Sequence, residues 1–438
     1  MVFYKKNLNN LFYTFVTIHL IVWTLVPFLT NHNLPLDTIE ALAWGSSLDW
    51  GFNKHPPMSA LFVEIFYQIF GSNDWAYYLL SQLFVIITFF IIYKFSYNFF
   101  KIKTLSLISI LLLEGIYFYN FTTPEFNVNV CQLPFWALTV YFAWKIYDKK
   151  NFDVKDCILL GIFSAFGFLS KYLFITLLIS IFLLFVYMFF KKRKKFDFKY
   201  LISLEVFMVL LLPHLIWLFY NDFITIKYAL DRGNIEGFKI INHLKNPLIF
   251  LLKQIGILIP FFLMVLILIK KFKIKINIKD KKLLFLFFIN IVPLIIILAF
   301  SILTGSKIRT MWMTPFYLFF GILFIYILQK QINYKNLRKF YFLFIFLFFL
   351  SPFLYSFVSL TNDNKRTDYP GREIAIKVEN EWNKNFEDKI LIVLGDEWSA
   401  GNLSYHLNSR PKWLGFIDKN KLEKMNKFIC IDDICVGN

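Results

Sequence analysis

The sequence predicts an all-α membrane protein with about eleven transmembrane helices and a small C-terminal α/β unit outside the bilayer. Three observations support this prediction. The 438 residues are 58% hydrophobic and 21% aromatic. The apolar residues fall in repeated runs of about 20, the length that a helix needs to cross a bilayer. Basic residues concentrate between alternate runs, and the composition turns polar after Leu360.

The apolar runs are expected to form the spanning helices. The first run is too long for a signal-peptide core and lacks a small-residue cleavage site, so we interpret it as a span. The run from 156 to 190 is divided at Ser170-Lys171, because a lysine in the middle of one long span is difficult to accommodate. The expected spans lie near residues 9–30, 75–96, 104–121, 127–146, 156–170, 172–190, 201–220, 247–269, 283–303, 310–328 and 340–360.

The net charge of +18 follows the expected topology. With these spans, 26 of the 47 Lys and Arg residues fall at the N-terminus or in connections on the same side of the membrane. The positive-inside rule then places the N-terminus in the cytoplasm and the C-terminus on the outer side of the membrane. A nucleic-acid-binding role would need a basic face with stacking aromatics in a soluble module, and the sequence contains none.

The chain divides into two predicted parts. Residues 1–360 form the transmembrane part, with outer loops at 31–74 and 221–246. Residues 361–438 form the small soluble part, with a strand near Lys389–Gly395 followed by a loop and helix. Cys430 and Cys435 lie in this second part, where they could form a short disulfide or remain two free thiols.

The first outer loop contains two carboxylates, Asp37 and Glu40, three residues apart and therefore on one helical face. Both could simply be solvated or stabilise a helix start, where the helix dipole favours an acid. We favour a catalytic role, because acids at a membrane boundary are costly unless something uses or pairs them. Trp44, one turn beyond Glu40, extends the same face into an aromatic surface suited to a sugar ring.

Lys54-His55-Pro56-Pro57 follows in the same loop. A lysine here could reach the lipid headgroups and end in a proline-terminated turn. Alternatively, Lys54 and His55 could hold a phosphate and neutralise the charge that develops as a sugar–phosphate bond breaks. The two prolines would fix the direction of the backbone in either case.

A second acid lies in the turn between the third and fourth spans, in Thr122-Thr123-Pro124-Glu125-Phe126-Asn127. A turn acid is commonly only solvated. Glu125 lies on the same side of the membrane as Asp37, however, so we interpret it as a second site carboxylate with Asn127 beside it. The outer cations Lys171, Arg232, Lys307 and Arg309, with Tyr172 next to Lys171, suit either phosphate contacts or headgroup contacts.

Common cofactor and nucleotide motifs are absent from the sequence, which contains no HExxH, P-loop, strand-linked GxGxxG or pair of CxxC motifs. A DxD-type pair that would indicate a nucleotide-sugar enzyme is absent as well. We therefore expect that no cofactor is required, although two adjacent acids could hold a divalent metal.

The motifs resemble those of bacterial integral-membrane glycosyltransferases of the type-C fold (families 39 and 83), which include the aminoarabinose transferases and the protein mannosyltransferases. The similarity rests on several short segments of this sequence. These are Leu36–Pro57 with Phe70-Gly71, Thr123–Asn127, Ser170–Tyr172, Leu212–His214 with Asp222-Phe223, Gly305–Lys307 with Trp312–Pro315, Gly401–Tyr405 and Arg410-Pro411.

The resemblance implies that a sugar is transferred from a polyprenyl phosphate, such as undecaprenyl phosphate, to an outer acceptor. The acceptor could be lipid A, the lipopolysaccharide core, another glycan or a protein. By this similarity Asp37 matches the first-loop acid, Glu125 the second acid, and Lys54 or His55 the phosphate-contacting lysine. The alternative is a transporter or flippase of lipid-linked sugars, but transporters usually show internal repeats and midplane polar sites, and neither is apparent here.

Overall fold

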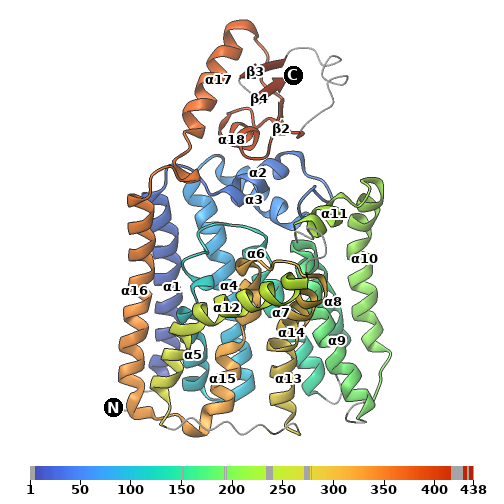
Figure 1. The fold of residues 1–438 in the computed structure, drawn as a ribbon, viewed down its shortest axis with the longest axis vertical. Coiled ribbons are helices and arrows are strands. Elements are labelled where there is room, and N and C mark those ends of the chain that lie inside the picture. The colour runs from blue at the N-terminus through green and yellow to red at the C-terminus, as the bar shows by residue number, and fades with distance from the viewer. Residues whose placement is uncertain are drawn as a thin grey trace.

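The computed structural model describes residues 5–149, 152–191, 193, 195–232, 240–270, 277, 279–415, 428–431 and 434–437. Long helices run side by side through the body of the molecule, and a small α/β unit lies beyond one end of them (Figure 1). The N-terminal end of the chain lies at the opposite end of the bundle from this unit. The predicted all-α polytopic architecture is confirmed.

Seven helical segments within the described ranges are long and apolar enough to cross a membrane. The chain is thus a multi-pass membrane protein, as its composition predicts. The helices of these segments are α1 (Lys5–Thr30), α4 (Asp74–Phe100), α9 (Ile175–Phe190) preceded by η3 (Tyr172–Phe174), α10 (Lys199–Tyr220), α12 (Ile240–Leu268), α13 (Lys281–Asn290) with α14 (Val292–Thr304), and α16 (Leu337–Thr361) preceded by η6 (Tyr334–Asn336).

The predicted number of eleven spans is not confirmed, because several expected spans are short or broken. Residues 310–331 bend by 53° between a segment that ends at Tyr317 and one that begins at Phe320. The division of the 156–190 run at Lys171 is correct, since a helix ends at Ser170. The shorter elements are α5 (Lys103–Leu111), η1 (Leu112–Gly115), η2 (Tyr117–Tyr119), α6 (Val128–Cys131), α7 (Leu133–Asp148), α8 (Val154–Ser170), η4 (Thr310–Tyr317), α15 (Phe320–Leu328) and η5 (Gln329–Gln331).

The end of the bundle next to the C-terminal unit, called the outer end after its predicted location, carries three short helices, α2 (Leu36–Ser47), α3 (Met58–Phe70) and α11 (Ile224–Asp231). The first two form the predicted loop 31–74, and α2 and α3 lie directly beneath the C-terminal unit (Figure 1). The predicted loop 221–246 is shorter than expected, because α12 already begins at Ile240. These helices place the candidate site at the outer end of the molecule.

The C-terminal unit contains helices and strands and has a small hydrophobic core of its own around Val378, Trp382 and Val393. Strand β1 pairs with β2 in parallel and with β4 in antiparallel orientation, and β3 pairs with β4. The β3–β4 register places the Cα atoms of Cys430 and Cys435 opposite each other, and a disulfide between them stays a prediction. The elements are η7 (Arg366–Asp368), α17 (Gly371–Asn385), β1 (Ile392–Leu394), α18 (Ser399–His406), β2 (Lys412–Trp413), β3 (Phe428–Ile431) and β4 (Ile434–Gly437).

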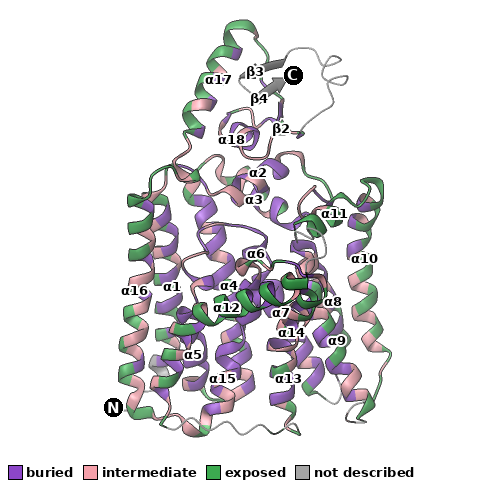
Figure 2. Ribbon diagram, in the orientation of Figure 1, coloured by how far each residue is buried: buried purple, intermediate pink, exposed green. Residues whose placement is uncertain are grey.

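Burial differs between the inner and outer helices of the bundle (Figure 2). Helix α4 is buried over 67% of its most apolar window, whereas α10 and α16 are each buried over only 17%. The exposed side chains of α10 and α16 include large apolar ones such as Phe219 and Phe342. Lipid tails can cover such surfaces, so the burial pattern agrees with a membrane protein.

Close packing of α5 against α15 depends on a glycine. A Cβ at Gly321 would overlap the backbone carbonyl oxygen of Ser109, and a backbone atom cannot move aside as a flexible side chain can. Small residues allow such close helix contacts in membranes.

We therefore predict that Gly321→Ala destabilises the protein by about 1–3 kcal/mol. The measurement is the thermal unfolding midpoint of the detergent-purified protein. Gly256→Ala is the matched control, because nothing lies within 4 Å of the added Cβ on α12, and alanine favours a helix by up to about 1 kcal/mol over glycine. Equal midpoints for Gly321→Ala and the wild type would contradict the close packing.

Candidate functional site

Two of the predicted acids, Asp37 and Glu125, are brought together where the N-terminus of α2 contacts the loop before α6. The backbone N–H of Asp37 donates to Glu125 Oε1 at 3.0 Å, and Thr38 Oγ1 donates to the carbonyl oxygen of Phe126 at 3.1 Å. Pro35 precedes α2 and offers no side-chain cap, so Glu125 supplies the acceptor that a capping residue would otherwise provide. Asp37 and Glu125, 88 residues apart in sequence, thus belong to one site.

Asn127 extends this contact toward α6. Its side-chain oxygen accepts from the backbone N–H groups of Asn129 and Val130 and so caps α6. Its amide group lies 3.5 Å from Glu125 Oε2. Asn129 in turn accepts a hydrogen bond of 2.5 Å from Lys171 Nζ. A polar chain therefore connects Glu125 to a lysine at the break between α8 and α9.

Lys171 is buried, with 9% of its surface exposed, and its ammonium lies 5.4 Å from the Trp312 ring centre. Burial lowers the pKa of Lys171 to about 7, although the Asp37 carboxylate opposes this shift. The sequence predicted a lysine at an outer turn, and the structure shows instead that it reaches into the site.

Burial raises the pKa of Asp37, and Lys171, Arg232, Lys54 and Arg309 act in the opposite direction. Burial also raises the pKa of Glu125, and the nearby Asp37 carboxylate adds to that shift. The two acids therefore hold their protons more readily than ordinary carboxyl groups do. Groups whose pKa values are displaced toward neutral pH are suited to proton transfer.

Lys54 is not the free cation that the sequence predicted. Its Nζ lies 2.8 Å from Glu40 Oε1 and 3.3 Å from Glu397 Oε2. The neighbouring Asn53 donates to the other oxygen of Glu397 at 2.7 Å. Glu40, predicted as a catalytic acid, is thus engaged with a lysine, and Glu397 of the C-terminal unit joins the site without any signal in the local sequence.

His55 and Trp44 form a wall beside the acids. One ring of Trp44 stacks on Phe52 with 5.6 Å between ring centres, and its edge faces His55 at 5.8 Å. Trp44 is 2% exposed, so its ring is enclosed in this structure, and its contact with a sugar stays a prediction. Burial, with Lys171 and Lys54 nearby, lowers the pKa of His55 to about 3, which leaves the imidazole neutral.

A small cavity lies between these residues and is lined by Asp37, Glu40, Trp44, His55, Ser59, Asn127 and Val128. Its volume of about 10 Å³ corresponds to about one water molecule. The indole N–H of Trp44 and the hydroxyl of Ser59 are buried without a hydrogen-bond partner among the described residues.

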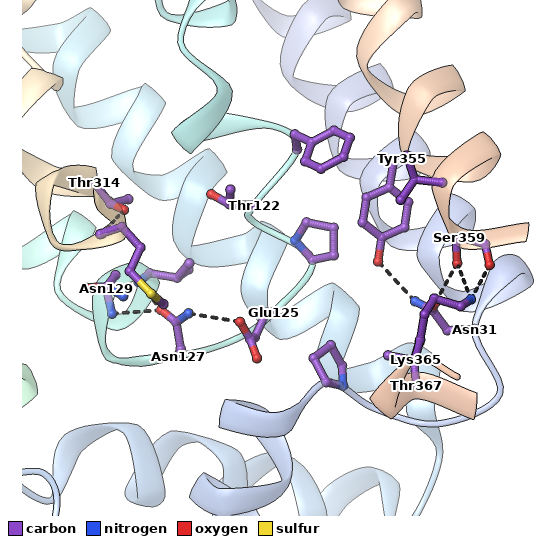
Figure 3. A pocket seen from close by; sticks show the side chains of 16 residues that line it. Asn31, Thr122, Glu125, Asn127, Asn129, Thr314, Tyr355, Ser359, Lys365 and Thr367 are labelled. Carbon is purple, nitrogen blue, oxygen red and sulfur yellow. Dashed lines mark hydrogen bonds between the residues drawn. The ribbon is translucent and has the colours of Figure 1, made fainter. Parts of the chain in front are cut away.

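A larger cavity of about 390 Å³ lies on the other side of Glu125. Figure 3 shows Glu125 and Asn127 on one side of it, and Asn31, Ser359 and Lys365 on the other. Phe121, Pro124, Met311 and Tyr355 contribute apolar wall. Glu125 lines only the larger cavity, whereas Asn127 lines both, so the two spaces adjoin at the loop that holds the second acid.

The residues on the side of this cavity opposite Glu125 were not predicted from the sequence. Asn31 follows the end of α1 and donates to the Tyr355 hydroxyl at 3.0 Å, and it accepts from Ser359 at 2.7 Å. Lys365 lies 3.3 Å from Asp368 and donates to the backbone of Ser359. Polar residues at the end of a span gave the only signal, and that signal is common to many membrane helices.

The other predicted residues fall into two groups. Tyr172 is engaged, because its hydroxyl is hydrogen-bonded at 2.7 Å to Nε2 of His214, whose Nδ1 lies 2.6 Å from the carbonyl oxygen of Trp50. Tyr172 thus fixes the loop after α2, and a free hydroxyl for substrate is not what the structure shows. Arg232, Lys307 and Arg309 are exposed, and Arg232 and Arg309 are close enough to influence the pKa of Asp37.

No group of three or more His, Cys, Asp or Glu side chains is arranged to hold a metal ion within the described residues. The adjacent acids Asp37 and Glu125 offer two carboxylates, one of which already accepts a backbone N–H. Metal dependence therefore stays a question for experiment.

Comparison with known proteins places this geometry in a fold class. The family model of dolichyl-phosphate-mannose-protein mannosyltransferases matches residues 54–217. Among solved structures, ArnT from Cupriavidus metallidurans bound to undecaprenyl phosphate superposes with a TM-score of 0.63 at 12% identity, over 93% of this chain and 86% of that chain. Its apo form gives 0.61 at 12% identity, over 95% and 87%. No curated protein matches the sequence significantly.

The chain therefore has the type-C fold of integral-membrane glycosyltransferases, and the resemblance noted in its sequence is confirmed. The superposition extends over nearly the whole chain, so the likeness includes both the helical bundle and the outer loops. At this level of identity the likeness concerns the fold, and the residues of the site stand on the geometry described above.

The pKa of Lys171 leads to a testable dependence of stability on pH. An unfolded lysine has a pKa near its ordinary value of 10.5, and the folded value is about 7. The unfolded state therefore binds more protons between these values, and folding stability rises as pH increases through this interval.

We predict that the wild type gains stability relative to Lys171→Met between about pH 7 and pH 9.5, by at most about 1.4 kcal/mol per pH unit. Thermal unfolding midpoints of the two proteins across this range provide the measurement. Lys227→Met, which changes an exposed lysine of α11, serves as the control and should follow the wild type. Parallel profiles for Lys171→Met and the wild type would contradict the assignment.

Proposed function

We propose that this protein transfers a sugar from a polyprenyl phosphate, such as undecaprenyl phosphate, to an acceptor on the outer side of a bacterial inner membrane. The observation that carries the proposal is the junction of Asp37 with Glu125, surrounded by Lys171, Arg232 and Arg309. Paired acids beside several cations are what a reaction needs when it removes a proton and releases a phosphate. The type-C fold and the mannosyltransferase family match support the same reaction class.

In the proposed reaction, the Asp37 carboxylate accepts the proton of an acceptor hydroxyl. The hydroxyl oxygen attacks the anomeric carbon of the donor, and the bond between that carbon and the phosphate oxygen breaks. The electron pair of that bond leaves with the polyprenyl phosphate. One displacement inverts the anomeric centre, and a product that retained the donor configuration would contradict this scheme.

Each residue has a proposed role in this step. Glu125 orients the acceptor, because it faces the larger cavity while its other oxygen is fixed by the N-terminus of α2. Lys171, Arg232, Lys307 and Arg309 neutralise the departing phosphate, with Lys54 available when its carboxylate partners release it. Asn127 and the neutral His55 can contribute hydrogen bonds. The scheme routes no step through a metal.

The larger cavity is suited to the sugar-bearing part of a substrate. Its volume of about 390 Å³ lies in the range of about 300–1,000 Å³ that is typical of small-molecule sites. Aromatic and proline surfaces alternate there with amide, hydroxyl and carboxylate groups, which is the mixture that a sugar ring requires. Lipid A, lipopolysaccharide core, other glycans and proteins are the acceptor classes to be distinguished.

We predict that Asp37→Asn abolishes transfer, with a loss of about 10²-fold or more, because a base commonly contributes 10²–10⁴-fold. Mass spectrometry of lipid A, core glycans and envelope glycoproteins from cells with and without the active protein provides the measurement. A sugar mass that is absent with Asp37→Asn at equal protein level would name the acceptor. Asp49→Asn, an exposed acid in the same loop, is the control and should retain the sugar.

Two results would overturn parts of the proposal. Asp37→Asn with a wild-type level of the sugar would remove Asp37 from the base role. If no envelope glycan differs between cells with and without the protein, and purified protein moves lipid-linked sugars across vesicles without forming a glycosidic bond, the flippase alternative replaces the transferase.

A further inference from the structure

Glu397 of the C-terminal unit reaches into the candidate site from a turn that is held in place. Asp396 Oδ1 accepts from the backbone N–H groups of Trp398 and Ser399 at 2.8 and 2.9 Å, which fixes the start of α18. The adjacent Gly395 has φ 138°, a conformation that favours glycine. The side chain of Glu397 then contacts Asn53 at 2.7 Å and Lys54 at 3.3 Å, and is 13% exposed.

The charges around Lys54 do not balance. One ammonium lies between the carboxylates of Glu40 and Glu397, so the three groups carry one excess negative charge when all are ionised. Burial would lower the pKa of Lys54, but the hydrogen bond and charge of Glu40, with the charge of Glu397, raise it overall. A phosphate that bound Lys54 in this arrangement would lie beside both carboxylates, so its contact with the lysine would be stronger if one carboxylate left.

Glu397 is the carboxylate that can leave. Glu40 lies on α2, the helix that also carries Asp37, and its contact with Lys54 is the shorter one. Glu397 lies before the first residue of α18 in a turn that begins at a glycine. Its contact with Lys54 is longer, at 3.3 Å.

The rest of the C-terminal unit is anchored independently of Glu397. Arg410 forms an ion pair with Glu64 at 2.6 Å, and Tyr405 donates to Asp74 at 2.7 Å. Asn402 accepts from Asn33 at 2.7 Å. Rotation of the Glu397 side chain away from Lys54 therefore requires neither the turn at residues 395–398 nor the whole unit to detach.

We propose that Glu397 is a positioning residue that occupies Lys54 in the unliganded protein and is exchanged there for the phosphate of the lipid donor or of the polyprenyl phosphate product. This inference rests on the proposed function. Binding of the phosphate then displaces the Glu397 side chain from Lys54, so the C-terminal unit limits occupancy of the site. Glu397 does not contact the reacting atoms in this scheme.

The test is the affinity of the purified full-length protein for undecaprenyl phosphate in detergent. Glu397→Gln keeps the size and the hydrogen bond to Asn53 but removes the competing charge, so we predict that it binds about three- to tenfold more tightly than the wild type. In a Lys54→Ala background the same change should have no effect, because the group for which Glu397 competes is gone. Glu381→Gln is the matched control, since Glu381 is exposed on α17 and contacts Lys384.

The outcomes distinguish the exchange at Lys54 from the proposed function. Tighter binding by Glu397→Gln that disappears with Lys54→Ala supports the exchange. If Glu397→Gln binds undecaprenyl phosphate only as tightly as the wild type, or more weakly, the exchange is overturned but the proposed function is not. Tighter binding that persists without Lys54 also overturns the exchange. If neither protein binds undecaprenyl phosphate, both the exchange and the proposed donor are wrong.

Discussion

The candidate site depends on the contact between the N-terminus of α2 and the Glu125 loop. This single junction joins the two acids, because Asp37 begins the helix and Glu125 accepts one of its unpaired N–H groups. The positive end of the helix dipole stabilises a carboxylate at that point, while burial opposes its charge. The opposition of these two effects keeps the acids close to the pH range in which they can exchange protons.

Burial and charged partners also have opposite effects on the two lysines near the acids, Lys171 and Lys54. Lys171 is buried among polar partners and loses its charge more readily than an exposed lysine does. Lys54 keeps its charge because two carboxylates surround it. Burial therefore sets the pKa of Lys171, and ion pairing sets the pKa of Lys54. A bound anion would change both pKa values.

The sequence was sufficient for features that depend on neighbouring residues. Asp37 and Glu40 on one helix, the break at Lys171 and the strand after Lys389 all follow from local pattern, and the structure contains each of them. Long-range pairings could not be predicted in this way. Glu397 forms an ion pair with Lys54, 343 residues away in the sequence. His214 is hydrogen-bonded to the hydroxyl of Tyr172, which lies in a different helical segment. The number of spans is not confirmed for a related reason, because hydropathy does not show where a helix shortens inside a protein.

A loop can hold Glu125 in a defined position because the segment before it is hydrogen-bonded on several sides. Ser81 and Gln82 of α4 both donate to the carbonyl oxygen of Thr123. Asn120 donates to Glu114 and accepts from Ser351 of α16 at 3.1 Å. The loop is thus fixed to α4 and α16, and α16 also lines the larger cavity through Tyr355, Val358 and Ser359. Such support lets an irregular segment present a carboxylate as reproducibly as a helix would.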